Sequence, residues 1–409
     1  MSGASASTGA PRSPRRGARP LTAVLLGSLG AIALASASGL ASCKDDPHLR
    51  SDGASPVGGA CQVEPGQLPE PNCDNSSKEC TPQPGCTIDE GRCGSASTCL
   101  PLADQKGKKI KDLRIRRLNI AAPAALAQEF IQRTVVTLNI DLAEKSCGEV
   151  GKGLFSWIFR VDRDANELLT GGAPPPTDAL GQGFCFANYD ANGIAIEPAR
   201  FKIAFEGDTF RTTEKQKLNV PVFLSADLAS SIVLPLSDVT VSGVTLSDDG
   251  NCVGSFRKEG LQSDCAEDPT SCPKWLTAGA LGGYMTLEEA DAVIIRDLGR
   301  SLCVVLSQGT PNGEGKCLRG ADGKLTYKGD YCSTTKKAGD CQDSVWLAAT
   351  FAASGAKIFD GAGVPGCSGA STRDGGADAS KPDASLPDAS LPDASQDASA
   401  DASQDARRD

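Results

Sequence analysis

Seventeen cysteines in 409 residues constrain the fold of this chain more than any other feature. Disulfides persist in oxidising compartments and are rare in the cytosol, where reductants keep thiols free. Zinc is the competing use of cysteine, but zinc sites favour only about two to four residues between paired cysteines and often add histidine. The closest cysteines here, Cys80/Cys86 and Cys93/Cys99, have five residues between them. We therefore predict an exported, disulfide-bonded chain.

A single histidine limits the chemistry that the chain can perform. His48 lies near the N-terminus, so residues 49–409 contain no histidine. This excludes Ser-His-Asp and Cys-His nucleophile pairs, and histidine-ligated metal hydrolases, from that part of the chain. The formal net charge of −10 argues against a nucleic-acid partner. The sequence accordingly suggests no catalytic residue, no metal site and no cofactor.

Residues 21–43 (LTAVLLGSLGAIALASASGLASC) have the pattern of an export signal, because a basic start precedes an apolar core that ends in small residues. The stretch closes on Leu40-Ala41-Ser42-Cys43, which resembles the lipobox of bacterial lipoproteins. The resemblance implies that residues 1–42 are a signal peptide cleaved between Ser42 and Cys43, and that Cys43 carries the lipid. Lys44 after the cysteine implies outer-membrane delivery. An uncleaved transmembrane helix and ordinary signal cleavage are the alternatives.

Setting Cys43 aside leaves sixteen cysteines, an even number that is consistent with eight disulfides. Residues 43–60 are rich in proline, glycine, serine and aspartate and are predicted to be a flexible tether. Residues 61–99 hold six cysteines and few apolar residues, so we predict a cysteine-rich module held by three disulfides of its own. A rigid stalk and a small recognition module are the alternatives for its role.

Basic residues gather after this module. Residues 100–111 are interpreted as a basic linker. The next residues alternate Leu113 and Ile115 with Arg114 and Arg116, which predicts a half-buried strand with an exposed basic face. We interpret this strand as an edge strand protected by charge. The alternative is a docking surface for anionic lipid headgroups or an acidic partner.

Residues 112–367 are predicted to form a mainly β, disulfide-stapled domain, either a sandwich or a barrel, with one or two short helices. Short runs of alternating apolar residues, such as residues 302–306, predict its strands. Between residues 232 and 246 the apolar side chains switch parity twice. This predicts a bend at Pro235–Val239 and a β-bulge at Gly243.

Two helices are expected within this domain. The pattern favours a helix over 124–133 and a strand over 135–142. Thr286 and Glu289 have the spacing of a capping box, and Gly299 is placed to end the helix that follows. The buried stripe predicted for that helix comprises Leu287, Ala290, Val293, Ile294 and Leu298.

Three features match a known kind of functional site only in part. Residues 188–193 resemble the start of an EF-hand calcium loop, but Ala199 stands where that loop needs glutamate. Asn192-Gly193 favours a hairpin turn instead. Trp275 is the candidate for an exposed carbohydrate contact. The densest group of acidic residues comprises Glu288, Glu289 and Asp291. Their positions suit the first turn of a helix, where the helix dipole favours acidic side chains.

Residues 368–409 repeat Asp-Ala-Ser and are predicted to be a disordered acidic tail. The lipobox, the segment CTIDEGRCGSASTCLPLA, the segment MTLEEADAV and these repeats together resemble cysteine-rich secreted lipoproteins of myxobacterial type, a resemblance that implies no activity. We expect a lipid-anchored protein of the bacterial cell envelope, at the outer membrane or cell surface, with a binding or structural role. Its partners would be the membrane and a protein or polysaccharide of the envelope or matrix. The alternative is a carboxylate-based extracellular hydrolase resembling a glycosidase.

Overall fold

The computed structural model describes residues 61, 63–75, 85–191, 193–223, 225–228, 231–267 and 272–367. The predicted signal peptide, the tether and the acidic tail lie outside these residues, and so do Ser42 and Cys43. None of the helices in the described ranges has the length and apolar character needed to cross a bilayer.

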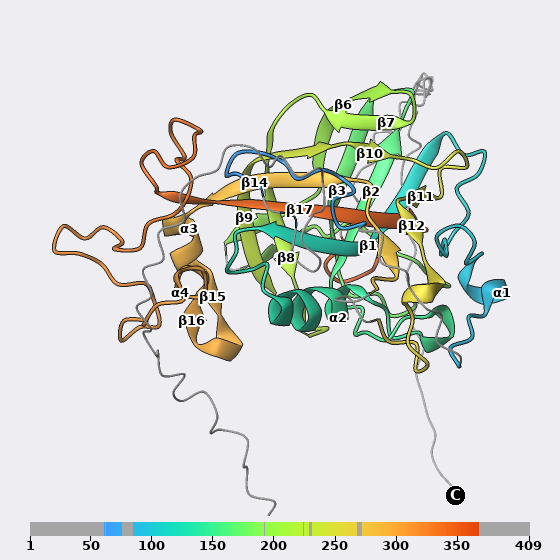
Figure 1. The fold of residues 1–409 in the computed structure, drawn as a ribbon, viewed down its shortest axis with the longest axis horizontal. Coiled ribbons are helices and arrows are strands. Elements are labelled where there is room, and N and C mark those ends of the chain that lie inside the picture. The colour runs from blue at the N-terminus through green and yellow to red at the C-terminus, as the bar shows by residue number, and fades with distance from the viewer. Residues whose placement is uncertain are drawn as a thin grey trace, which may run out of the picture. The chain divides into compact units, whose positions relative to one another are not determined.

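One large antiparallel sheet dominates the structure, so the prediction of a mainly β fold is confirmed (Figure 1). The strand order is β10-β7-β6-β3-β2-β1-β17-β14-β9-β8, and β11 pairs with β17. The long strand β17 runs through the middle of this order, between β1 and β14 (Figure 1). The strands are β1 (Ile110–Ala122), β2 (Ser156–Asp162), β3 (Glu167–Ala173), β6 (Ala199–Glu206), β7 (Thr209–Thr212), β8 (Gln216–Val222), β9 (Ile232–Ser242), β10 (Val244–Thr245), β11 (Cys252–Val253), β14 (Ala280–Thr286) and β17 (Ser344–Gly355).

The sheet curls until its two ends meet. Strand β9 pairs with β8 and β14 at one end, whereas β10 pairs with β7 at the other end. Only Gly243, at φ +61°, separates β9 from β10. The Thr212 hydroxyl of β7 accepts a hydrogen bond from Val241 N (3.1 Å) and donates one to Val241 O (3.3 Å). One bent strand therefore closes the sheet in the manner of a barrel.

The predicted irregularities of this strand are only partly right. The β-bulge lies at Ser237–Thr240, where the register with β14 shifts and Asp238 adopts φ +52°. That position falls in the predicted bend at Pro235–Val239. The predicted β-bulge at Gly243 is wrong, because the chain changes partner strand there instead of continuing along β14.

Apolar side chains fill the interior of the curled sheet. Leu113 and Ile115 of β1 belong to this core, as do Phe159 of β2 and Phe351 of β17. The two phenylalanine rings stack with their centroids 5.3 Å apart. Because full burial of one such side chain contributes about 1.5–3 kcal/mol, this core supplies the main driving force for folding.

Short helices and two-stranded ribbons surround the sheet. The helices are α1 (Glu90–Cys93), η1 (Ile131–Thr137), α2 (Leu138–Ile140), η2 (Lys145–Cys147), η4 (Lys258–Gly260), α3 (Leu287–Ala292), η5 (Arg296–Leu298) and α4 (Leu302–Ser307). The ribbons pair β4 (Tyr189–Ala191) with β5 (Ile194–Ile196), β12 (Ser255–Phe256) with β13 (Trp275–Leu276), and β15 (Ile294–Ile295) with β16 (Arg300–Ser301).

Helix α3 confirms the predicted capping box. The Thr286 hydroxyl accepts a hydrogen bond from Glu289 N, and the Glu289 carboxylate accepts one from Thr286 N, both at 3.2 Å. The helix ends earlier than predicted, because β15 begins at Ile294. The apolar stripe is therefore wrong at Ile294 and Leu298, which are 39% and 58% exposed. Gly299 ends η5 rather than α3.

The strand predicted over 135–142 is helical. Helix η1 and helix α2 span most of it, and helical turns begin at Glu129. The Gln132 side chain donates to Leu118 O (2.7 Å) and accepts from Ile120 N (2.9 Å). A side chain thus satisfies backbone groups of β1 that another strand would otherwise pair with, so no strand is needed there.

The strand predicted over 302–306 is also wrong, because these residues form α4. The Ser301 hydroxyl caps this helix by accepting a hydrogen bond from Val304 N at 3.3 Å. Cys303 is buried along with Leu302, Val304 and Leu306. A helix buried on nearly every side leaves no helical periodicity in the sequence, and the alternation was misleading for that reason.

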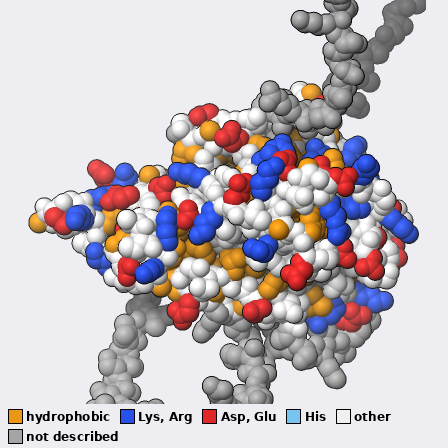
Figure 2. Space-filling view, turned by 90° about the horizontal axis from the view of Figure 1, so that it is seen from above, with side chains coloured by type: hydrophobic (Ala, Val, Ile, Leu, Met, Phe, Trp, Pro, Cys, Tyr) orange, Lys and Arg blue, Asp and Glu red, His pale blue; other side chains and the backbone are white. Residues whose placement is uncertain are grey.

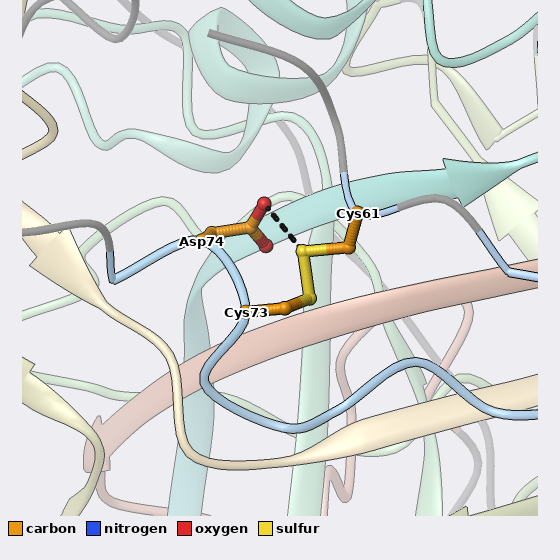
Figure 3. A group of neighbouring side chains, drawn as sticks. All are labelled: Cys61, Cys73 and Asp74. Carbon is orange, nitrogen blue, oxygen red and sulfur yellow. Dashed lines mark hydrogen bonds between the residues drawn. A yellow bond between two sulfur atoms is a disulfide. The ribbon is translucent and has the colours of Figure 1, made fainter. Parts of the chain in front are cut away.

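All fifteen described cysteines are disulfide-bonded, which confirms the predicted use of cysteine. The pairs among described residues are Cys61–Cys73, Cys86–Cys265, Cys93–Cys147, Cys99–Cys252, Cys185–Cys367, Cys303–Cys317 and Cys332–Cys341. Figure 3 shows the first of these pairs, with a carboxylate oxygen of Asp74 lying 3.1 Å from Cys61 Sγ.

The prediction of three disulfides internal to residues 61–99 is wrong. Cys86, Cys93 and Cys99 each bridge to the β-rich domain rather than to one another. The segment has too few apolar residues to make a core of its own. It gains burial by covering the outer side of the sheet, where Cys93, Cys99 and Leu100 are fully buried.

Candidate functional site

The most unusual group of side chains lies on the outer side of β1. Four cations and three carboxylates meet there with little access to solvent, and we call this group the buried ion cluster. Its members are Arg114, Arg116, Arg117, Lys274, Asp141, Glu149 and Glu267.

This cluster overturns the prediction of an exposed basic face on an edge strand. Strand β1 lies between β2 and β17 rather than at the edge of the sheet. Arg114 and Arg116 are 0% and 1% exposed. They do alternate with core residues, but loops that carry carboxylates cover their side of the sheet. Neither a charge-protected edge nor a lipid-docking surface exists at these arginines.

A β-bulge brings two consecutive arginines into the cluster. The register between β1 and β17 shifts between Ile115 and Arg117, which leaves Arg116 as the extra residue. Arg116 donates to the Glu149 carboxylate, and Arg117 Nη1 lies 2.8 Å from Glu267 Oε2. A buried ion pair is costly to break, because the partner that remains is left as an uncompensated charge.

Arg114 is satisfied by backbone and hydroxyl oxygens instead of by a carboxylate. Its Nη2 donates to Ile140 O (2.6 Å) at the end of α2, and its Nε donates to Ser156 Oγ (3.1 Å). Its guanidinium also lies 5.3 Å from the ring centroid of Phe184. Burial lowers the pKa of Arg114 to about 10. The cation therefore stays charged at neutral pH and helps to end α2 favourably.

Lys274 forms the fourth cationic centre. Its ammonium donates to the Asp141 carboxylate and, at 3.0 Å, to Gly148 O. Burial raises the pKa of Asp141 to about 6, although Lys274 opposes the shift. Burial acts to lower the pKa of Lys274, but the carboxylates of Asp141 and Glu149 outweigh it, so that pKa is raised. Both groups therefore hold their protons more tightly than they would in water.

The cluster fastens several loops to the sheet. Glu149 also accepts from Leu142 N (2.6 Å), and Glu267 accepts from Lys274 N (2.9 Å). The disulfides Cys93–Cys147 and Cys86–Cys265 join the same loops to the N-terminal segment. The geometry is that of a structural clamp, in which each charge is bonded within the protein.

Sequence reasoning missed the acids and the lysine of this cluster. These residues lie in loops and match no motif, and they are Asp141, Glu149, Glu267 and Lys274. The one available signal was the alternation of arginines with core residues in β1. We interpreted these arginines as solvent-exposed, whereas they are buried.

Trp275 was predicted to be an exposed contact, and this is wrong. It is 1% exposed. Its ring lies 5.2 Å from the ring of Phe256, and the Arg116 guanidinium lies 4.8 Å from its centroid. A buried tryptophan stacked on an arginine stabilises the clamp and offers no platform to a sugar.

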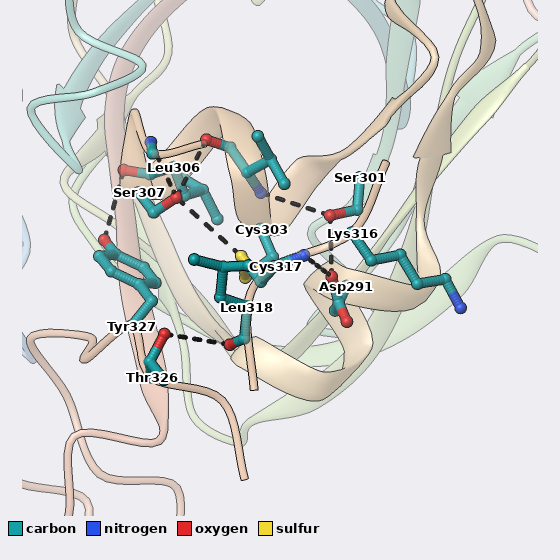
Figure 4. The surroundings of a disulfide bond; sticks show 12 residues. Asp291, Ser301, Cys303, Leu306, Ser307, Lys316, Cys317, Leu318, Thr326 and Tyr327 are labelled. Atoms are coloured by element: carbon teal, nitrogen blue, oxygen red, sulfur yellow. Dashed lines mark hydrogen bonds between the residues drawn. A yellow bond between two sulfur atoms is a disulfide. The ribbon is translucent and has the colours of Figure 1, made fainter. Parts of the chain in front are cut away.

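The acids of α3 hold a loop in place, and Figure 4 shows one of them, Asp291. Asp291 is buried, and its Oδ1 accepts from Ser301 Oγ and from Cys317 N, both at 2.8 Å. Arg319 Nη2 lies 3.1 Å from Asp291 Oδ2 and 2.7 Å from Glu288 Oε2. These two carboxylates share one arginine, so they fasten the loop that carries Arg319 to α3.

The other predicted sites also have structural roles. Asp190 Oδ1 accepts from Gly193 N at 2.7 Å within the β4–β5 turn, so the hairpin interpretation of this segment is confirmed. Three groups of cysteines and acids in the described ranges have the compactness of a metal site. In each group the two cysteines are joined in a disulfide, as in Figure 3, which removes the thiolates that would bind a metal.

No protein-family model, curated protein or solved structure matches this chain.

Proposed function

We propose that the protein is an exported, lipid-anchored component of a bacterial cell envelope, with a binding or structural role. The observation that carries this proposal is the oxidation of all fifteen described cysteines. Seven pairs of them span 9 to 182 residues. Such a set forms and persists outside the reducing cytosol.

The charge pattern on one face of the molecule bears on how the protein could meet a membrane. On the face in Figure 2, basic and acidic side chains are interspersed. Mixed charge of this kind favours solubility over attachment to anionic lipid. Membrane attachment would therefore rest on the lipid at Cys43, and two or more acyl chains would anchor it stably.

The anchor can be tested in the full-length chain. We expect wild-type protein to incorporate labelled fatty acid and to enter the detergent phase, and we expect Cys43→Ala to do neither. Ser42→Ala is the matched control, since it keeps a small residue before the cysteine and should leave lipidation intact. A Cys43→Ala protein that still took up label would contradict the proposed attachment site.

The location can be tested on intact cells. Protease added outside the cells should remove the protein if it faces the medium, and a cytoplasmic marker should survive. Thiol alkylation under denaturing, non-reducing conditions should find the fifteen described cysteines blocked. Free thiols at most of these positions would refute export to an oxidising compartment.

A further inference from the structure

Lys274 and Asp141 form a direct contact between two loops that are 133 residues apart in sequence. The lysine ammonium donates to the aspartate carboxylate. Their side chains are only 1% and 7% exposed. A primary amine and a carboxyl group are thus held together in a site that largely excludes water.

We propose that Lys274 and Asp141 join in an intramolecular amide bond between the lysine Nζ and the aspartate Cγ. The observation that carries the proposal is the buried, direct contact of these two groups. The new bond would be a covalent crosslink between the loop after α2 and the loop before β13.

The reaction is a condensation, and it needs no oxidant, reductant or other reactant. One proton passes along the hydrogen bond from the Lys274 ammonium to the Asp141 carboxylate, which leaves a neutral amine and a carboxylic acid. The amine nitrogen attacks Cγ and forms the N–C bond. A C–O bond of the carboxyl group then breaks, and its hydroxyl leaves as water after taking the second proton from nitrogen.

We assign the transfer of that second proton to Glu149. It interacts electrostatically with both Asp141 and Lys274, and the carbonyl of its neighbour Gly148 accepts from Lys274 Nζ. Its pKa is lowered because Arg116 and Lys274 outweigh the effect of burial, so it is an anionic base at neutral pH. Its oxygens bond to Arg116 and to Leu142 N, and each keeps a further lone pair.

Burial favours this reaction in two ways. It raises the pKa of Asp141 to about 6, and so it favours the carboxylic acid that must lose its hydroxyl. It also fixes the two groups in contact, which replaces a bimolecular encounter by a reaction of high effective concentration. The ammonium of Lys274 donates directly to the Asp141 carboxylate, so Asp141 rather than solvent is the acceptor of its first proton.

The test is the mass of the folded, full-length wild-type protein after reduction and alkylation. We expect it to be lighter by one water molecule than the mass required by its sequence, its processing and lipid at Cys43, and its alkylated cysteines. Trypsin should not cleave after Lys274, because it does not cut at an acylated lysine. The peptides that carry Asp141 and Lys274 should be recovered as one branched species. An unmodified mass with normal cleavage after Lys274 would overturn the proposal.

Two variants and one internal control test whether the mass loss comes from this amide bond. Lys274→Arg keeps a cation beside Asp141 but cannot form this amide, so its mass should match its sequence. The exposed pair Lys202–Glu167 is an internal control whose peptides should stay separate. Glu149→Gln should slow or abolish the mass loss in protein that retains its disulfides. A complete crosslink in Glu149→Gln would refute the proton-carrying role.

Discussion

Arg116→Met should destabilise the protein strongly through the charge that it leaves behind. Arg116 donates to Glu149, to Leu100 O (3.0 Å) and to Ser354 Oγ (2.7 Å). Methionine fills much of the same volume but donates none of these bonds. Breaking a buried ion pair by removing one partner costs about 3–5 kcal/mol, and the loss of the stack on Trp275 belongs to the same change.

A second substitution tests whether the charge is the cause. Glu149→Gln in the Arg116→Met background removes the uncompensated carboxylate while keeping an acceptor for Leu142 N. We expect the double variant to be more stable than Arg116→Met by about 2 kcal/mol, because the Glu149 charge, whose ion-pair partner is Arg116, is then removed as well. If the second substitution only added to the loss, the charge argument would be wrong.

Urea unfolding with the disulfides intact, followed by tryptophan fluorescence, measures these differences. The matched control is Lys202→Met, which breaks a pair with Glu167 at a lysine whose side chain is 57% exposed. An exposed pair contributes about 0–1 kcal/mol, so this variant should stay near wild type. A loss in Arg116→Met no larger than that in Lys202→Met would show that burial adds nothing to the strength of the Arg116–Glu149 pair.

Two further predictions concern backbone space and acid stability. A Cβ at Gly254 would lie 2.0 Å from Leu276 O, whereas at Gly323, which has a similar positive φ, it would meet nothing within 4 Å. Gly254→Ala should therefore cost about 1–3 kcal/mol more than Gly323→Ala in urea unfolding, and equal costs would contradict the clash. Burial acts to raise the pKa of Asp343, but hydrogen bonds from Ser333 and Ser344 outweigh it, so that pKa is lowered. A lowered folded-state pKa means stability that is present above the unfolded value and lost as pH falls through the folded value. The melting temperature of Asp343→Asn should thus fall less than that of wild type below pH ~4, and parallel curves would show that the carboxylate adds nothing.

The features that sequence could predict are those that local chemistry decides. The capping box of Thr286 and Glu289 needs only residues three apart, and it forms as expected. The alternation in β1 likewise places Leu113 and Ile115 in the core.

The features that sequence could not predict depend on remote partners. Arg116 is buried for two reasons that lie far away in the sequence. Strand β17 pairs with β1, for example Gly355 with Leu113, so β1 is not at the edge of the sheet. Distant loops also cover the arginines and supply Glu149 and Glu267. Disulfide pairing was open for the same reason, because spacing alone does not choose among the possible connectivities.

The position of β17 sets the order in which the protein can fold. Strand β1 begins at residue 110, and its neighbour β17 spans Ser344–Gly355, so the middle of the sheet joins nearly the first and the last described strands. When the chain is made from its N-terminus, β1 has no β17 to pair with until more than two hundred further residues have been added. Non-local pairing of this kind slows folding. The native sheet can therefore assemble only after almost the whole described chain is free to fold.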